Sequence, residues 1–477
     1  MNHKFNNSIF RAYDIRGIYN ETLFDNDAYF IGKAFASYLI ANNKKNVAIA
    51  CDGRLSSPIL KERLIQGLKF SGLNVFDIGI GPTPMLYFSV YHLECHAGIM
   101  VTGSHNPSHH NGFKFMVKDV DFFGDDILNL SKIAEFGKFY EGEGKLKEVN
   151  VKQVYVNRIL SECSLQKSES ELLDEVDELI KPIKKIKIAW DAGNGSAGEV
   201  MTMLTQRINA EHILLFNDID GNFPNHHPDP TVEKNLQDLI KVVKENNCDL
   251  GVAFDGDGDR IGVVDGQGEI IWGDQLMILF SRDILSENPN QKIIADVKAS
   301  NILFDEIKKA GGQPIMWKTG HSLIKAKMRE SKSILAGEMS GHIFFADKYY
   351  GFDDGLYSAI RLIEIVFKSD QSLSEMRKQI PKTYFTSEIR IECLEEEKFQ
   401  IIKKIKQDLI SSNHNFNDID GIRVNEEFGW WLIRASNTQS ALVARCEADS
   451  VENLKKLKLK LQQNLKFYNI KIPHELE

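Results

Sequence analysis

Three aspartates at alternate positions, Asp255, Asp257 and Asp259, have the spacing in this chain that most clearly points to chemistry. They follow the apolar run Leu250–Phe254, which predicts a buried strand. Side chains at alternate positions of an extended backbone point the same way, and the glycines between them let the chain fold tightly. Carboxylates this close repel one another unless a cation neutralises them, and a hard divalent cation takes oxygen ligands. The stretch therefore predicts a metal ion, and the fixed charge of Arg260 beside it is suited to phosphate.

Two other structures contain similar residues. An Asp-Gly pair alone is an ordinary turn signal, so a solvated loop is the alternative to a metal site. A calcium EF-hand loop also begins with alternating acidic residues, but it requires glycine at its sixth position and glutamate at its twelfth. Those positions hold Arg260 and Gly266 here, which excludes an EF-hand.

Ser104 is the residue best suited to carry a transferable group. It follows the apolar run Ala97–Val101, so we expect it on a loop just past a strand. A serine in such a place is commonly a turn or capping residue, and the functional alternative is a hydroxyl that becomes modified. The nucleophile elbow of the α/β-hydrolases is excluded, because Asn106 stands where that motif has glycine. Lys114 follows an Asn-Gly pair that predicts a tight hairpin, which would return Lys114 toward Ser104.

The elements that must position these residues alternate between strands and helices. Four short apolar runs each end at an aspartate: 47–51 before Asp52, 186–190 before Asp191, 250–254 before Asp255 and 293–295 before Asp296. Amphipathic stretches such as Ser57–Phe70 and 236–246 predict helices between the runs. The alternation is typical of α/β domains with mostly parallel sheets, and in such sheets ligands bind beyond the carboxyl ends of the strands.

The composition restricts the class of protein. The chain has 477 residues, of which 43% are hydrophobic and 26% charged, a profile typical of a folded protein with several domains. Its formal net charge of −9 and the lack of a long basic tract argue against nucleic acid as a partner. The six cysteines are scattered, as expected for reduced thiols in a cytoplasmic protein. We expect no signal peptide and no membrane partner, because the sequence has neither the apolar leader segment nor a run of about 18 apolar residues.

Two further motifs are more simply structural. The loop at 193–198 fits a Gly-x-Gly-x-x-Gly pattern, but it lacks both the lysine of a P-loop and a partner acid downstream, so we favour a structural loop over a nucleotide site. His226 and His227 lack the cysteines or carboxylates that would complete a zinc site, and we expect them to be structural.

Four motifs occur in an order and spacing that resemble a known family. They are Thr-Gly-Ser-His-Asn-Pro at 102–107, Asp-Gly-Asp-Gly-Asp-Arg at 255–260, Gly-Glu-Met-Ser-Gly-His at 337–342 and Arg-Ala-Ser-Asn-Thr at 434–438. Together they resemble the α-D-phosphohexomutases over nearly the whole chain. The segments 10–17 and 318–321 favour the bacterial phosphomannomutase/phosphoglucomutase branch of that superfamily.

The resemblance implies an α/β fold with three mixed α/β domains and a smaller α+β C-terminal domain around a central cleft. We place the domains at 1–152 with the phosphoserine loop, 153–266 with the metal loop, 267–370 with the sugar-binding loop and 371–477 with the phosphate-binding loop. The charged segment 168–185 predicts a surface helix in the second domain.

The resemblance also implies roles for individual residues. Ser104 would carry the phosphoryl group and, with Asp255, Asp257 and Asp259, would hold Mg²⁺. The other catalytic residues would be His105, Lys114, Arg260 and His321. The substrate-binding residues would be Tyr13, Arg16, Lys298, Glu338, Ser340, Arg434, Ser436, Asn437 and Thr438. The last four offer a guanidinium fork, hydroxyls and an amide, which by themselves suit phosphate.

The function that the resemblance implies is transfer of a phosphoryl group between the 1- and 6-hydroxyls of a hexose, mannose or glucose, with a 1,6-bisphosphate of that sugar as intermediate and activator. The partners would be small hexose phosphates, and we expect a monomer. Three alternatives share part of the chemistry: a phosphoglucosamine mutase, a non-catalytic protein that binds sugar phosphates, and a metal-dependent phosphatase in which water replaces the sugar hydroxyl.

Overall fold

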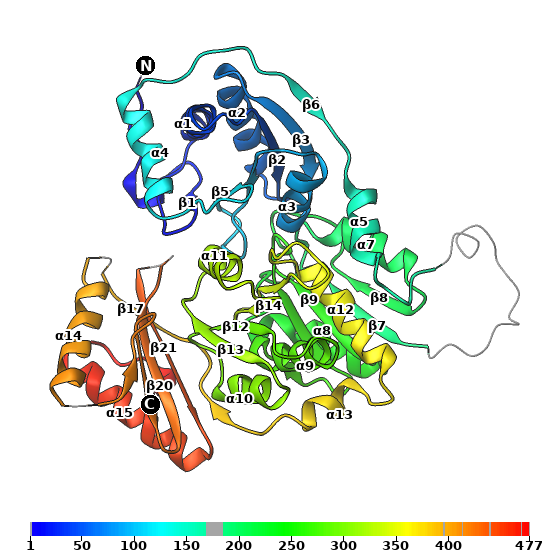
Figure 1. Ribbon diagram of the computed structural model, residues 1–477, viewed down its shortest axis with the longest axis vertical. Helices are drawn as coiled ribbons and strands as arrows, with labels where there is room; N and C mark the ends of the chain where they lie inside the picture. Colours follow the sequence, from blue (N-terminus) through cyan, green and yellow to red (C-terminus); the bar gives the residue numbers. More distant parts are fainter. Residues whose placement is uncertain are drawn as a thin grey trace, which may run out of the picture.

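The computed structural model describes residues 2–167, 185–394, 396–412, 414–437, 440–468 and 470–476. Within these residues four sheets follow one another along the chain, with helices packed around them (Figure 1). The expectation of three mixed α/β domains and an α+β C-terminal domain is confirmed. The boundaries drawn between the domains stay predictions, and the helix predicted for 168–185 falls outside the described residues except at Lys185.

The first sheet is mixed, with the strand order β1-β5-β4-β2-β3-β6. Strand β2 runs parallel to β3 and β4, whereas β5 is antiparallel to β1 and β4. The strands are β1 Ile15–Ile18, β2 Asn46–Cys51, β3 Asn74–Ile80, β4 Ala97–Val101, β5 His110–Val117 and β6 Leu146–Glu148. The helices are η1 Asn7–Ile9, α1 Asp25–Ala41, α2 Ser57–Phe70, α3 Thr83–His92 and α4 Asp125–Phe136. The apolar runs predicted before Asp52 and Ser104 are therefore β2 and β4, neighbours at the centre of this sheet.

The second sheet has the order β11-β10-β9-β7-β8, in which β7 runs parallel to β8 and β9. Its strands are β7 Lys187–Asp191, β8 Glu211–Leu215, β9 Leu250–Phe254, β10 Ile261–Asp265 and β11 Ile270–Ile271. The helices are α5 Lys152–Leu160, α7 Gly198–Arg207, η2 Glu233–Leu236 and α8 Gln237–Glu245. The stretch 255–260 is the turn between the antiparallel strands β9 and β10.

The third sheet has the order β13-β12-β14-β15. Its strands are β12 Lys292–Asp296, β13 Gln313–Trp317, β14 Leu335–Gly337 and β15 Ile343–Phe345. The helices are α9 Gly273–Glu287, α10 Asn301–Lys309, α11 His321–Ser331, α12 Gly355–Lys368 and α13 Leu373–Lys378. Helix α12 begins at a capping residue, because the Asp354 side chain accepts a hydrogen bond from Tyr357 N at 2.9 Å.

The C-terminal sheet is antiparallel, with the order β16-β21-β20-β19-β18 and with β17 also paired to β21. Its strands are β16 Tyr384–Phe385, β17 Ile389–Glu392, β18 Phe416–Asn417, β19 Ile422–Glu426, β20 Gly429–Ala435 and β21 Ala441–Ala448. The helices are α14 Lys398–Ser411, α15 Val451–Phe467 and η3 His474–Leu476.

One hydrophobic core runs through the first three domains, whereas the C-terminal domain has a core of its own. Tyr87, Trp190 and Tyr357, from three different domains, belong to the shared core. The contact with the C-terminal domain is largely polar: the buried Arg423 donates to Val297 O at 2.5 Å and to Ala299 O at 2.8 Å. The first three domains therefore pack as one body, to which the fourth is attached through hydrogen bonds and a small apolar contact.

The hairpin predicted at the Asn-Gly pair is wrong. Asn111 and Gly112 lie inside β5, between β1 and β4. Gly112 is needed for close packing rather than for a turn, since a Cβ atom there would approach the Ile15 carbonyl oxygen to 1.9 Å. Lys114 nevertheless returns to the neighbourhood of Ser104, because β5 itself runs back along β4 after the loop that holds Ser104.

The loop at 193–198 and His226 both make contacts inside the second domain, and their interpretation as structural stays a prediction. The loop at 193–198 packs behind the acidic turn, where Ser196 N donates to Gly256 O at 3.0 Å. His226 Nε2 lies 2.9 Å from Asp191 Oδ2, an ion pair or hydrogen bond inside the second domain. All six cysteines are free. Among the described residues, no helix has the length and apolar character needed to cross a membrane.

Candidate active site

A cavity of ≈ 750 Å³ collects residues from all four domains. Most of the site residues predicted from the sequence line it: Tyr13, Arg16, Ser104, His105, Lys114, Arg260, Lys298, His321, Glu338, Ser340, Arg434, Ser436 and Asn437. Asp255, Asp257 and Asp259 are fully buried beside Ser104 and do not line it. Thr438 lies outside the described residues.

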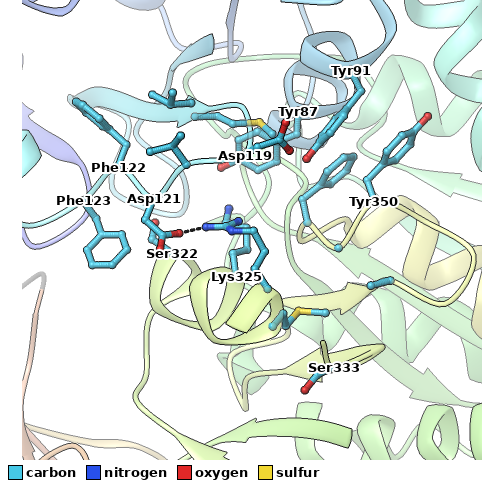
Figure 2. A pocket seen from close by; sticks show the side chains of 18 of the residues that line it. Tyr87, Tyr91, Asp119, Asp121, Phe122, Phe123, Ser322, Lys325, Ser333 and Tyr350 are labelled. Atoms are coloured by element: carbon cyan, nitrogen blue, oxygen red, sulfur yellow. Dashed lines mark ion pairs between the residues drawn. The ribbon is translucent and has the colours of Figure 1, made fainter. Parts of the chain in front are cut away.

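A second cavity, of ≈ 390 Å³, lies between the first and third domains (Figure 2). Aromatic side chains such as Tyr91 and Tyr350 form part of its wall, and Asp121 makes an ion pair with Arg329 across it. None of the predicted site residues lines this second cavity, so the candidate chemistry belongs to the larger one.

Ser104 occupies a strained position directly after β4. Its φ of 52° is in the left-handed region, which is unfavourable for a residue with a side chain. Its Oγ lies 3.2 Å from His105 Nδ1 and donates to Asp255 Oδ2 at 3.3 Å. Burial, followed by the charge of Arg260, lowers the pKa of His105 well below its ordinary value, so its imidazole is neutral. Ser104 is thus held between an uncharged imidazole and the acidic turn.

Arg54, which the sequence analysis missed, holds this loop in place. Its guanidinium is buried and donates to the carbonyl oxygens of Ser104 (2.6 Å), Asn106 (2.6 Å) and Pro107 (2.5 Å). Nε of Arg54 also donates to Asp52 at 3.0 Å. The residue gives little signal in the sequence, because its partners lie about 50 positions away along the chain. The Arg54 clamp, meaning this guanidinium and its carbonyl partners, is the main support of the strained serine.

The three aspartates meet the requirements of a cation site. One ligand atom from each lies within 4.8 Å of the others, and all three side chains are fully buried. Asp257 Oδ1 and Asp259 Oδ1 have no hydrogen-bond partner among the described residues. Burial and then its two acidic neighbours raise the pKa of Asp255 well above its ordinary value. Buried carboxylate oxygens without hydrogen-bond partners, beside an Asp255 whose charged form is disfavoured, fit an ion such as Mg²⁺.

Lys114 also neutralises this cluster. Its Nζ donates to Asp257 Oδ2 at 2.6 Å and to Asp259 Oδ2 at 2.5 Å. Burial alone would lower the pKa of Lys114, but the two carboxylates outweigh burial and raise it above the ordinary value. Lys114 is therefore a fixed cation next to Ser104 rather than a ready base.

Arg260 is oriented by a chain of buried groups that the sequence did not predict. Arg260 Nε donates to His342 Nε2 at 2.9 Å, and His342 Nδ1 lies 3.0 Å from Asp353 Oδ2. Lys325 Nζ donates to the other oxygen of Asp353 at 3.0 Å. His342 stands at the end of the Gly-Glu-Met-Ser-Gly-His motif, which was its available signal, whereas Asp353 lies in a stretch with no recognisable pattern.

Among the histidines that line the cavity, His321 has the imidazole with the fewest hydrogen bonds in the described part of the chain. Both ring nitrogens are buried without a hydrogen-bond partner among the described residues. Burial, followed by the charge of Lys325, lowers its pKa well below the ordinary value, so the ring is neutral. Its ring stacks on that of His342 with the centroids 5.7 Å apart.

Arg434 presents a guanidinium to the cavity from β20. Its Nε is fixed by Asp420 Oδ2 at 3.0 Å, whereas its Nη2 is buried without a partner among the described residues. Lys298 is fixed in a similar way, since its Nζ donates to Glu388 Oε2 at 2.9 Å. Glu338 accepts from Gly320 N at 2.5 Å, which joins the sugar-binding loop predicted there to the start of α11. The wall formed by Arg434 and Lys298 is suited to an anion.

Four successive domains that contribute to one cleft are the arrangement that the resemblance to the α-D-phosphohexomutases implies. The chain matches the phosphoglucomutase/phosphomannomutase alpha/beta/alpha domain I at residues 7–139, domain II at 170–268, domain III at 272–384 and the C-terminal domain at 388–463. The phosphomannomutase/phosphoglucomutase of Pseudomonas putida is 45% identical over 451 residues, which cover 94% of each chain. The phosphoglucomutase of Neisseria gonorrhoeae is 42% identical over 448 residues, 93% of each chain.

The fold agrees with these sequence relationships. The crystal structure of a phosphoglucomutase/phosphomannomutase family protein from Burkholderia thailandensis matches with a TM-score of 0.89 and 40% identity, over 98% of this chain and 100% of that one. The chain belongs to the phosphoglucomutase/phosphomannomutase family, and the resemblance drawn from the four motifs is confirmed.

Proposed function

We propose that this chain interconverts hexose 1-phosphates and hexose 6-phosphates, of mannose, glucose or both, through a phosphorylated Ser104 and a 1,6-bisphosphate intermediate. One observation carries the proposal: Ser104 of the first domain and Arg434 of the last line the same cavity of ≈ 750 Å³. The relatives named phosphomannomutase/phosphoglucomutase favour mannose and glucose over glucosamine, and an enzyme over a binding protein.

Ser104 and its neighbours are the proposed transfer site. Ser104 Oγ would carry the phosphoryl group, and Asp255, Asp257 and Asp259 would hold Mg²⁺ together with that phosphate. The chemistry that Mg²⁺ supplies when bound is neutralisation of the phosphate and polarisation of its phosphorus. Lys114 and Arg260 provide two further fixed positive charges beside Ser104, and phosphoryl transfer depends mainly on such charge stabilisation and positioning.

The transfer step needs a proton acceptor. The bond between phosphorus and Ser104 Oγ breaks while a bond forms from phosphorus to the sugar oxygen, whose proton must leave. His321 is the candidate acceptor, because neither nitrogen of its neutral ring has a hydrogen-bond partner among the described residues. The Ser104 oxygen leaves as an alkoxide and takes up a proton in turn; the cationic Lys114 is the candidate donor, and His105 lies 3.2 Å from that oxygen.

The other end of the sugar would be held by the far wall. Arg434 Nη2, together with Ser436, Asn437 and Thr438, would bind the phosphate that is not being transferred. Glu338 and Ser340 would hold sugar hydroxyls, and Tyr13, Arg16 and Lys298 would complete the contacts. The bisphosphate then turns end for end and returns its other phosphate to Ser104, so glucose or mannose 1,6-bisphosphate would act as activator.

The decisive experiment concerns Ser104. Intact-mass analysis of the wild-type protein should find a fraction heavier by one phosphate on the peptide that contains Ser104. Ser104→Ala should lose that mass and nearly all activity in a coupled assay on mannose 1-phosphate and glucose 1-phosphate. Ser108→Ala is the matched control, because Ser108 is exposed on the same loop. Full activity in Ser104→Ala would refute the mechanism, and release of inorganic phosphate in place of sugar 6-phosphate would identify a phosphatase.

The monomeric state and the cytoplasmic location expected from the sequence stay predictions. Sedimentation of the purified chain would test the first of them.

A further inference from the structure

A third cavity, of ≈ 330 Å³, lies beside the loop that holds Ser104. Its walls come from the N-terminal segment, β1, the loop between β4 and β5, and Ser440 of the C-terminal domain. We call it the basic cavity, after Arg11, Arg16, His105 and His110. It shares Arg16 and His105 with the active-site cavity and contains neither Ser104 nor Arg434.

The charged side chains that line the basic cavity, Arg11 and Arg16, are both cations; Asp14, which pairs with Arg16 at 2.6 Å, does not line it. No aspartate or glutamate is among the residues that line it. The carbonyl oxygens of Pro107 and His110, which would repel an anion, are already engaged by the guanidinium of Arg54 at 2.5 and 3.1 Å. An anion in this cavity would therefore meet cations and neutral groups, and the local field favours its binding.

Arg11 supplies the strongest indication of a ligand. In the part of the chain that the structure describes, its guanidinium makes neither a hydrogen bond nor an ion pair, and its Nε is buried without an acceptor. A buried donor without an acceptor is costly unless a ligand or water provides one. Arg16 is only partly engaged, since its side-chain bond among the described residues runs from Nε to Asp14 at 2.6 Å. Two guanidinium groups with unused donors suit a phosphate group, which accepts paired hydrogen bonds from such forks.

We propose that the basic cavity is a second phosphate-binding site, distinct from Ser104 and from the wall around Arg434, and that it takes inorganic phosphate or the phosphate group of a sugar phosphate. The site itself does not depend on the mutase chemistry. Its consequence for the reaction rests on the proposed function: a phosphate of the bisphosphate intermediate could reside next to the cleft while the sugar turns.

Binding without turnover tests the proposal. The background is the full-length chain with Ser104→Ala and Arg434→Ala, which has no phosphoserine and no distal guanidinium. Into this background we would introduce Arg11→Gln or, as the matched control, Arg63→Gln on α2, and titrate each protein calorimetrically with inorganic phosphate and then with glucose 1,6-bisphosphate. Arg63 also carries no ion pair among the described residues, so both changes remove one charge of the same kind.

The expected result is that Arg11→Gln weakens binding of both ligands by roughly tenfold to a hundredfold, the loss of one charge-assisted hydrogen bond, whereas Arg63→Gln leaves both unchanged. Melting temperatures should be alike in all three proteins, because the Arg11 guanidinium has no hydrogen bond or ion pair among the described residues to lose. Equal phosphate binding in the Arg11 and Arg63 variants would overturn the site. If Arg11→Gln weakened binding of inorganic phosphate but left binding of glucose 1,6-bisphosphate unchanged, the use of the site by sugar phosphates would be overturned.

Discussion

The Arg54 clamp makes the sharpest prediction, because it connects the stability of the first domain to the position of Ser104. We consider Arg54→Met, which keeps a long apolar stem and removes the charge and its donors. The guanidinium donates to four carbonyl oxygens and to Asp52, all of them in a buried environment. Removal of one partner of a buried charged pair costs about 3–5 kcal/mol.

The lower end of that range applies here. Asp52 keeps other donors after the substitution, since Thr102 Oγ1 donates to it at 2.7 Å and Ser57 Oγ at 2.5 Å. We therefore expect a loss of about 3 kcal/mol and a fall in Tm of roughly 10 °C. Without the clamp Ser104 can leave its left-handed conformation, whose cost is about 1–2 kcal/mol. Recovering that conformation for each transfer would lower kcat roughly fivefold to thirtyfold.

The assay separates misplacement of the serine from unfolding. Tm is measured by calorimetry. The kcat and the phosphorylation of Ser104 are then measured about 15 °C or more below the variant's Tm, a margin larger than the expected fall in Tm. Arg54→Lys, which keeps the charge but lacks the fork, should lie between wild type and Arg54→Met in both readouts. A folded Arg54→Met protein with wild-type kcat and full phosphorylation would refute the clamp.

Three further outcomes are expected. Chelation should abolish turnover, and added Mg²⁺ should restore it. Asp257→Asn should raise the Mg²⁺ concentration required for turnover and leave the fold unchanged. A rate that survives chelation would show that the acidic turn has a structural role only. Arg434→Ala should raise KM for the sugar phosphate and the loss of bisphosphate into solution roughly tenfold to a hundredfold, and a wild-type KM would place the distal phosphate elsewhere. Burial raises the pKa of Asp354 to about 6. Wild type should therefore lose about 3 kcal/mol of stability as pH rises from the unfolded pKa near 4 through 6. In urea unfolding at several pH values, Asp354→Asn should lack this part of the loss.

The sequence predicted the residues whose signals are local. An apolar run followed by acidic or glycine-rich residues marks the carboxyl end of a strand, and β2, β4, β7, β9 and β12 were found in this way. Ser104 and the acidic turn lie directly after such strands, so their position at the carboxyl ends of the strands followed from the chain direction.

The residues that the sequence did not predict act through partners far away along the chain. Arg54 binds carbonyl groups about 50 positions later, and Asp353 meets His342 only because β15 turns back toward the start of α12. The hairpin at the Asn-Gly pair failed for a related reason: a close neighbouring strand, rather than a turn, requires Gly112. Patterns of residue type report on the local backbone, and contacts of this kind depend on the assembled fold.

The electrostatic design of the cleft explains how one site can serve two positions of a sugar. Near Ser104 three carboxylates face Lys114 and, on the proposed function, a metal ion and a phosphate. Around Arg434 the balance is looser, because Nη2 is buried without a partner among the described residues and only Nε is neutralised. A wall with an unused donor favours whichever phosphate is not reacting, and it does so without regard to the sugar carbon that carries it. Transfer at Ser104 needs only a hydroxyl and a phosphate within reach. A bisphosphate that has turned end for end therefore offers the same groups to Ser104 and to Arg434.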